Sequence, residues 1–299
     1  MGKRGIIAGV VALGVIAGVG YWVGNQFDNV PLPRFGPDCT VEASGQVSLD
    51  HDQMANAATV TAVGVRLGMP DQAVVVALAT ALQESKLRNL PHLGDGNDHD
   101  SIGLFQQRPS QGWGSPEEIS QPQYAAERFY RALAQVDGWE AMRVTEAAQR
   151  VQRSAHPEAY QKWADEATVL ATALLGQAPG AVACVGPDQP TADAEAALTA
   201  LREAIALDWG TDLTEAGNAE PAVAADLTDD GSGPTLSVPA GDEATGWRYA
   251  HWLVAHAAQH GVTRVRFAGL EWTAADGSWS PAEAPGDAAA GQVPAELSR

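Results

Sequence analysis

The sequence has little positive charge. It holds 18 Lys and Arg against 37 Asp and Glu, for a formal net charge of −19, and no more than two basic residues stand together anywhere. A basic patch is the electrostatic signature of proteins that bind DNA or RNA. No nucleic-acid partner is therefore expected.

Cysteine is also scarce, because only Cys39 and Cys184 occur in 299 residues. This number excludes a disulfide-dense scaffold, and it leaves no cluster of cysteines that could hold zinc. We expect neither a metal nor a cofactor.

The N-terminus holds a long apolar run. Residues 5–26 carry no charge and follow Lys3 and Arg4. About 20 apolar residues cross a bilayer, and flanking basic residues stay on the cytoplasmic side. The run predicts a transmembrane helix that anchors the protein in the cell membrane, with the bulk of the chain extracytoplasmic. A cleaved signal peptide, giving a secreted form, is the alternative; however, the run exceeds the usual apolar stretch of about 7–15 residues, and no clear Ala-x-Ala site follows.

An extracytoplasmic location favours a disulfide between the two cysteines. An exported chain meets an oxidising environment in which disulfides persist. Cys39 and Cys184 are therefore predicted to form one bridge, which would tie together the two ends of the region between them. Two unrelated buried thiols are the alternative.

Length and composition predict two domains behind the anchor, since a domain averages about 150 residues. Pro and Asp interrupt any periodic pattern after Cys184, as in a linker. The last residues are rich in Pro, Gly and Ala with few apolar anchors, which is typical of disorder. The predicted parts are an anchor (1–27), a linker (28–49), a first domain (50–184), a linker (185–192), a second domain (193–281) and a disordered tail (282–299).

The first domain is predicted to be mostly helical. Residues 50–68 have the start and stop signals of a helix. Residues 70–85 are apolar nearly all round from 73 to 82, which predicts a helix buried on every side. Glu84 would emerge from the end of this core helix, partly withdrawn from water. Burial disfavours a charged carboxylate, so such a carboxyl group suits a general acid. A simply solvated glutamate at a helix end is the alternative.

A loop rich in Gly, Asn and Asp follows over residues 92–103 and predicts turns. Asp95, Asn97 and Asp100 also suggest a calcium loop. However, the sixth position is not Gly, and Gln106 stands at the twelfth, where calcium loops carry Glu. Plain turns are therefore favoured. Further helices are predicted over residues 115–136 and 144–175, the second with a break at His156-Pro157.

A resemblance rests on motifs in a fixed order: Glu84-Ser85, then Ser101-Ile102-Gly103-Leu104-Phe105-Gln106, then a helix from Tyr124 to Tyr130, then "AYQKWADEA". Over residues 50–176 they resemble the lysozyme-like domain of lytic transglycosylases, whose motifs are Glu-Ser, Gly-Leu-Met-Gln and a later helix with Asn and Tyr. The variant Gly-Leu-Phe-Gln-Gln-Arg-Pro-Ser is similar to actinobacterial members. The expected fold class is α+β: a mainly α-helical lysozyme-like domain and a small α/β domain, behind the transmembrane helix.

The resemblance implies an enzyme that cleaves the glycan strands of peptidoglycan outside the membrane. Glu84 would act first as acid and then as base, while a hydroxyl or N-acetyl group of the substrate completes the displacement and leaves a 1,6-anhydro product. One carboxylate then suffices, unlike in the two-carboxylate glycosidases. Trp113 and Tyr124 could stack on sugar rings or belong to the core. The residues implied at the substrate are Ser85, Ser101, Gly103, Leu104, Phe105, Gln106, Gln107, Trp113, Tyr124, Tyr130 and Tyr160.

The sequence departs from the family pattern. Phe105 stands where the family has Met, which exchanges one apolar wall for another. Glu127 stands where the family has its Asn, so a contact that orients the substrate is missing. The Tyr partner is Tyr160 or Tyr130. Because of Glu127, a non-catalytic peptidoglycan-binding or scaffold protein with the same fold is the alternative function.

The second domain predicts a helix, a short strand, a second helix and two strands joined by a turn at Gly269. This order resembles a small module at the C-terminus of exported actinobacterial cell-wall hydrolases, where it implies a targeting or regulatory part. His256 and His260 lie one turn apart on the second helix, and His251 lies further back. Zinc needs a third or fourth ligand, and none is evident. We expect packed or surface histidines.

Overall fold

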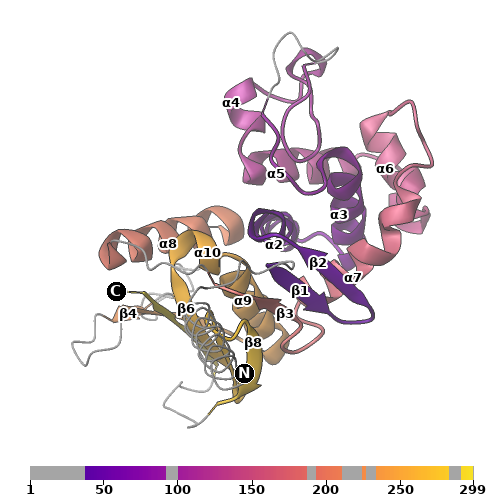
Figure 1. The fold of residues 1–299 in the computed structure, drawn as a ribbon. Coiled ribbons are helices and arrows are strands. Elements are labelled where there is room, and N and C mark those ends of the chain that lie inside the picture. Colours follow the sequence, from indigo (N-terminus) through magenta and orange to yellow (C-terminus); the bar gives the residue numbers. More distant parts are fainter. Residues whose placement is uncertain are drawn as a thin grey trace, which may run out of the picture. The chain divides into compact units, whose positions relative to one another are not determined.

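The computed structural model describes residues 38–91, 100–186, 193–210, 224–226, 234–282 and 291–298 (Figure 1). The predicted anchor and the loop residues Asp95 and Asn97 lie outside these ranges. Among the described helices, none has the length and apolar character needed to span a bilayer. The described chain mixes helices with two antiparallel sheets, in agreement with the α+β class.

The first half is built around helices. They are α2 (His51–Arg66), α3 (Asp71–Ser85), α4 (Pro116–Ile119), α5 (Pro122–Leu133), α6 (Val144–Gln152) and α7 (Ala164–Leu174), with short 3-10 turns at Pro109–Gln111, Trp139–Ala141 and Gln161–Trp163.

Two helix starts follow from local chemistry. Asp50 caps α2, because its carboxylate accepts from the Gln53 N–H while the Gln53 side chain accepts from the Asp50 N–H. This reciprocal pair satisfies two backbone donors that the helix leaves open.

The helix α3 starts after Pro70. From Ala73 to Leu82 every residue of α3 is buried, because α2, α5, α6 and α7 pack around it. The prediction of a helix buried on all sides is confirmed.

The segment predicted as a linker over residues 28–49 contains a β-hairpin, which corrects that boundary. Strands β1 (Cys39–Glu42) and β2 (Gln46–Leu49) pair antiparallel, and β3 (Val182–Cys184) adds to β1. The side chains alternate between buried and open positions along β2. A strand of four residues carries too little periodic signal to stand out from a loop, and its pairing partner lies far along the chain.

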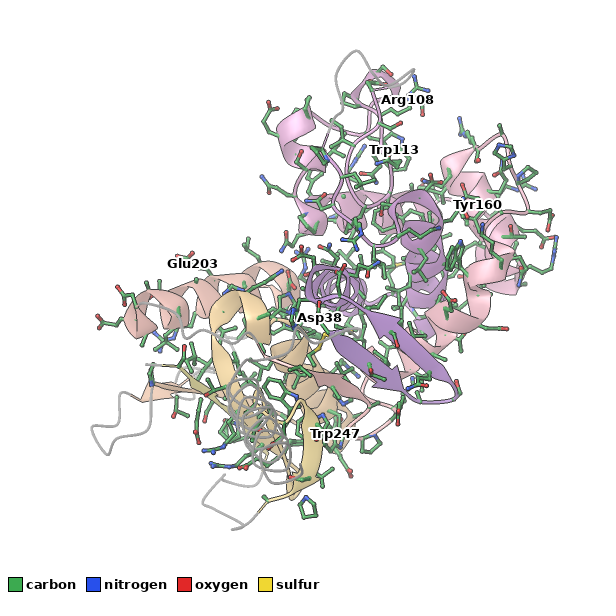
Figure 2. All side chains as sticks on the ribbon, viewed as in Figure 1. Asp38, Arg108, Trp113, Tyr160, Glu203 and Trp247 are labelled. Atoms are coloured by element: carbon green, nitrogen blue, oxygen red, sulfur yellow. A yellow bond between two sulfur atoms is a disulfide. The ribbon has the colours of Figure 1, made fainter. Side chains whose placement is uncertain are left out.

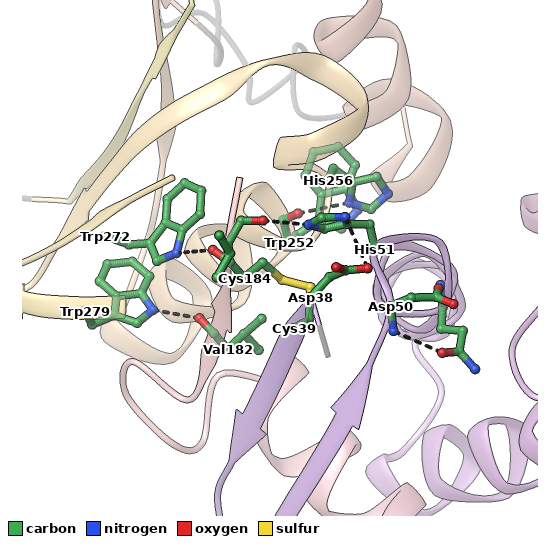
Figure 3. Close-up of a disulfide and its surroundings, with 12 residues drawn as sticks. Asp38, Cys39, Asp50, His51, Val182, Cys184, Trp252, His256, Trp272 and Trp279 are labelled. Atoms are coloured by element: carbon green, nitrogen blue, oxygen red, sulfur yellow. Dashed lines mark hydrogen bonds and ion pairs between the residues drawn. A yellow bond between two sulfur atoms is a disulfide. The ribbon is translucent and has the colours of Figure 1, made fainter. Parts of the chain in front are cut away.

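The predicted disulfide is present. Cys39 and Cys184 stand directly opposite one another in the β1–β3 pair, and their sulfurs are bonded. Figure 3 shows the bridge where the first sheet meets the second half of the chain. The bridge closes the helical half on itself.

The second half joins helices to a six-stranded antiparallel sheet of order β4-β5-β9-β6-β7-β8. The helices are α8 (Ala194–Trp209), α9 (Glu243–Ala255) and α10 (Ala257–His260). The strands are β4 (Ala224–Asp226), β5 (Thr235–Pro239), β6 (Val262–Phe267), β7 (Leu270–Thr273), β8 (Ser278–Pro281) and β9 (Gln292–Leu297).

The last strand overturns the expectation of a disordered tail over residues 282–299. Strand β9 pairs with β5 on one side and β6 on the other, so it lies inside the sheet. Val293, Ala295 and Leu297 alternate as buried residues on one face. Three apolar positions at period two suffice once two neighbouring strands supply the hydrogen bonds. Composition alone hides this pattern.

The two halves interlock, and residues Pro37–Arg299 form one compact unit. The indole N–H of Trp272 donates to the carbonyl of Cys184 (3.0 Å), and that of Trp279 donates to the carbonyl of Val182 (2.7 Å; Figure 3). The second sheet is thereby bound to the strand that carries the disulfide. The helix α9 packs against α2, α7 and β3 on one side and against β6 on the other.

Asp208 is the most deeply placed charged group of this junction. Its carboxylate, 1% exposed, accepts from Thr59 Oγ1 of α2 (2.7 Å), Gln123 Nε2 of α5 (2.7 Å) and Trp252 Nε1 of α9 (2.8 Å). Burying a carboxylate is costly unless donors replace the water it loses. Asp208 therefore holds three helices in one arrangement.

The histidines of the second half pack against neighbouring side chains. His251 and His256 are buried, and His256 stacks on Trp252. His251 Nδ1 lies 2.8 Å from the carbonyl of Ala173, while its Nε2 accepts from the Ala181 N–H (3.1 Å). The carbonyl requires a donor, so the neutral ring carries its proton on Nδ1. Within the described ranges, no three His, Cys, Asp or Glu residues are grouped as metal ligands would be.

Removing the disulfide should lower the free energy of unfolding. The bridge joins residues 145 apart in sequence, and in the chain-entropy model a loop of this length restricts the unfolded chain by about 4–5 kcal/mol. We expect a Cys39→Ala/Cys184→Ala variant to unfold at clearly lower urea concentration. A reducing agent should shift the wild type towards the variant and leave the variant unchanged. Two free thiols in the purified protein, found by non-reducing peptide mapping, would contradict the bridge.

Acid should destabilise the fold through His251. Burial lowers the pKa of His251 to about 4, whereas an unfolded histidine titrates near about 6.5. As the pH falls between these values, the unfolded state takes up a proton that the folded state refuses, so stability is lost by up to about 3 kcal/mol. A His251→Asn variant should lose less stability over this range in urea unfolding. Parallel pH curves for the two proteins would refute the assignment.

Candidate active site

Glu84 lies in the last turn of α3, at the place where the buried helix reaches the surface. Its side chain is half-buried. The helix ends there because Lys86 and Leu87 both adopt left-handed backbone angles. Such a reversal satisfies the last carbonyls of a helix and turns the chain away. The carboxyl group therefore sits at the edge of the core.

Two side chains hold one oxygen of this carboxyl. The hydroxyl of Tyr160 donates to Glu84 Oε1 (2.7 Å), and Gln152 Nε2 donates to the same oxygen (3.1 Å). Gln152 also donates to the carbonyl of Phe105 (2.8 Å). Glu84 Oε2 has no hydrogen-bond partner within the described part of the chain. One oxygen is thus fixed in place, and the other is available to a ligand.

Tyr160 is suited to this holding role. Its side chain is buried. Burial raises its pKa, and the negative charge of Glu84 raises it further. The phenol therefore stays protonated and remains a donor wherever the carboxylate is ionised. Its approach to Glu84 agrees with the expectation that Tyr160 is the tyrosine partner.

The motif from Ser101 onward forms a tight turn that packs on the end of α3. Ile102 and Gln107 pair as an isolated bridge. The hydroxyl of Ser85, the residue after Glu84, donates to the carbonyl of Leu104 (2.7 Å). Phe105 stacks on Phe129 of α5, with ring centroids 4.7 Å apart. The turn is therefore fixed against both helices.

Gly103 shows why this turn needs glycine. Its φ is +76°, and a Cβ there would lie 2.8 Å from the carbonyl oxygen of Ile119. Both the backbone angle and the space exclude a side chain. Gln106 next to it is half-buried, and its Nε2 donates to the carbonyl of Gly103 (3.0 Å). Of the motif residues beyond Ser101, Gln106 is the one whose side chain is not buried.

Several residues expected to contact substrate point into the core instead. The side chains of Ser85, Leu104, Phe105 and Gln107 are buried beneath the turn, so they support it rather than line a surface. Tyr130 is also buried, and its hydroxyl donates to the carbonyl of Val60 (3.0 Å). These expectations are corrected: Leu104 and Phe105 remove apolar surface from water, and hydrogen bonds compensate the burial of the Ser85 and Tyr130 hydroxyls.

Trp113 lies in the loop before α4 (Figure 2) and contacts Tyr124 and Arg128 of α5. The hydroxyl of Tyr124 and the guanidinium Nε of Arg128 both donate to the carbonyl of Trp113 (3.2 and 3.1 Å). Both aromatic side chains are half-buried. They stabilise the loop between the turn and α5, and within the described ranges neither side chain forms a hydrogen bond with Glu84, Tyr160 or Gln152.

Glu127 is occupied elsewhere. Its carboxylate forms ion pairs with Arg66 of α2 (3.1 Å) and Arg131 of α5 (2.8 Å). The amide that does reach Glu84 belongs to Gln152, which sequence reasoning missed. A glutamine at the end of a short amphipathic helix carries no pattern of its own. Only the packing of α6 on α3 reveals it.

Of the three residues that suggest a calcium loop, Asp100 is the one that the structure describes. Its carboxylate accepts from Arg108 Nε (2.9 Å) and from the N–H of Ser110 (2.7 Å). These donors lower the pKa of Asp100, with Arg108 the largest cause. The carboxylate is therefore engaged in shaping the chain after the motif.

Lys86 and Trp163 contact one another near the end of α3. The indole N–H of Trp163 donates to Gln83 Oε1 (2.9 Å), and Lys86 Nζ lies 3.9 Å from the centre of its ring. Burial is the largest cause of a lowered pKa at Lys86.

Comparison with protein-family models and with curated proteins gives no match to this sequence.

Alkaline pH should reveal the contact between Tyr160 and Glu84. An unfolded tyrosine ionises near pH about 10, whereas the folded pKa of Tyr160 is raised. As the pH rises past the unfolded value, the unfolded state releases a proton that the folded state keeps, so stability falls. Urea unfolding of Tyr160→Phe should show a shallower loss over this range than the wild type. Equal slopes would mean that Tyr160 does not carry the shift.

Proposed function

We propose that the protein is a peptidoglycan-cleaving enzyme of the lytic-transglycosylase type with a lysozyme-like helical domain. The observation that supports this most is the carboxyl of Glu84, with one oxygen held by Tyr160 and Gln152 and the other open. The motif order in the sequence points to the same chemistry. The proposal draws on the site rather than on the fold alone.

The geometry suits one carboxyl acting twice. Protonated Glu84 donates its proton from Oε2 to the glycosidic oxygen as the bond to the sugar breaks. The carboxylate then takes the proton of the sugar's own C6 hydroxyl, which attacks the same sugar carbon and closes the 1,6-anhydro ring. Tyr160 and Gln152 keep Oε1 in place throughout. Positioning of this kind lowers the activation barrier because the acid is already oriented toward the glycosidic oxygen.

The proposed location is the outer face of the cell membrane. The apolar run over residues 5–26 would anchor the chain, and the disulfide between Cys39 and Cys184 is of the kind that an oxidising compartment maintains. The glycan strands of peptidoglycan lie in that compartment. The anchor would keep the site close to newly exposed wall.

A non-catalytic peptidoglycan-binding protein is the second candidate, and Glu127 is the feature that favours it. The amide-bearing position of the family pattern carries an acid here, and that acid is bound to Arg66 and Arg131. A substrate contact would then have to come from another side chain. Gln152 is the amide that is present at Glu84.

Replacing Glu84 with Gln tests the enzyme directly. Gln keeps the shape and hydrogen-bonding capacity of the side chain and removes the transferable proton. We expect glycan cleavage to fall by about 10² or more, measured on cell-wall material in a zymogram. The control is Glu203→Gln, because Glu203 is exposed on α8 and labelled well away from Tyr160 in Figure 2. It makes the same charge change and should cleave at the wild-type rate.

Three results separate the candidates. Wild-type cleavage by a folded Glu84→Gln protein would overturn the catalytic role. Binding of wall material without cleavage by any variant would favour the non-catalytic protein. Reducing sugar ends in place of 1,6-anhydro ends would leave a glycosidase and remove the transglycosylase mechanism.

A further inference from the structure

A pocket of about 790 Å³ is lined by residues of α6, of the segment between α5 and α6, and of the turn that follows α6. Its lining combines apolar, acidic and basic side chains with one amide: Val136, Asp137, Met142, Gln149, Arg150 and Arg153. The site at Glu84 uses none of these six residues. The pocket therefore needs an explanation of its own.

Its two arginines are unusual in this protein. Most described arginines bind a carboxylate or a carbonyl, as expected in a chain of net charge −19. Arg150, Arg153 and Arg202 are the described arginines whose guanidinium groups make no ion pair and no hydrogen bond within the described part of the chain. Two of these three line one pocket. A guanidinium presents paired donors that match the two oxygens of a carboxylate.

The pocket also contains acceptors without donors. Gln149 Nε2 donates to the carbonyl of Ser154 (2.8 Å), which fixes the orientation of the amide. Gln149 Oε1 is then left buried with no hydrogen-bond partner. Such an acceptor is unfavourable until a donor reaches it. Asp137, at the same pocket, makes no ion pair with any described residue.

The remaining lining is apolar. Val136 and Met142 are half-buried and pack against the core. A small inorganic anion would gain nothing from this surface, and the carboxylate of Asp137 would repel a doubly charged one. A ligand that matches the arginines, the free amide oxygen and the apolar surface carries a carboxylate, a neighbouring N–H group and a small apolar group. The free C-terminal end of a peptide has these three features.

We propose that this pocket binds the carboxylate end of a short peptide. The carboxylate lies on Arg150 and Arg153, an N–H group of the peptide reaches Gln149 Oε1 after a small movement of the side chains that cover it, and the last side chain packs on Val136 and Met142. Asp137 accepts from a second N–H.

The pocket and the candidate active site share α6. Gln152, which holds Glu84, stands between Arg150 and Arg153 in sequence. If the protein acts on peptidoglycan, the pocket would receive a peptide branch while the glycan reaches Glu84. This extension rests on the proposed function, whereas the peptide site itself does not.

Binding is tested by calorimetry on the full-length protein in a mild detergent. The probes are N-acetyl-alanyl-alanine with a free carboxylate, the same peptide with a C-terminal amide, and inorganic phosphate. We expect the free acid to bind with a Kd of about 1 mM or tighter, and the amide and phosphate at least about tenfold more weakly. An Arg150→Gln/Arg153→Gln variant should lose binding by a similar factor.

Two controls make the test specific. Arg202→Gln removes an equally unpaired, exposed arginine from α8 and should leave binding unchanged. Glu84→Gln should also bind normally, so a failed enzyme and a failed peptide site give different results. The proposal is overturned if the amide or phosphate binds as well as the acid, if the double variant binds like the wild type, if Arg202→Gln weakens binding equally, or if no probe binds.

Discussion

The buried carboxylate of Asp208 is the constraint on which the arrangement of the helices depends. Removed from water, it is tolerable only because Thr59, Gln123 and Trp252 each donate to it. These donors lie on α2, α5 and α9, and both α2 and α5 also pack on α3. The position of the helix that ends in Glu84 is therefore tied to the second half of the chain. Losing any one donor would leave a partly uncompensated charge in the core.

Packing around α3 explains why an acid stands where it does. A helix buried from Ala73 to Leu82 has one fixed place in the core, so its last turn is fixed as well. The turn over residues 102–107 then closes on that end through Ser85 and Phe105. Glu84 remains half-buried because the turn, Tyr160 and Gln152 surround it without covering its second oxygen. The buried helix thus fixes the position of Glu84, and its place at the end of that helix leaves Oε2 without a partner among the described residues.

Patterns within a short stretch of sequence predicted well, and contacts between distant stretches did not. The burial of α3, the disulfide and, in the second half, α8, α9, β5, β6 and β7 were predicted from periodicity, turn residues and the placement of the two cysteines. The hairpin at Cys39–Leu49 and the strand β9 gain their hydrogen bonds from partners far along the chain, so composition misread them as linker and tail. Tyr160 was found because a motif named a tyrosine. Gln152 was missed because nothing local marks it.

The short helix α6 contributes side chains to both the candidate active site and the pocket. Its start is fixed by Arg143, which pairs with Glu146 and Glu158, and by Thr145, which donates to the carbonyl of Pro157 (2.6 Å). Its end is fixed by Gln152, whose Nε2 donates to Glu84 Oε1 and to the carbonyl of Phe105. The helix that carries Arg150 therefore also carries Gln152, the donor to Glu84 Oε1. The strength of that hydrogen bond depends steeply on distance and angle. The acid at the end of α3 is thus supported by a helix that also contributes Gln149 and Arg150 to the pocket.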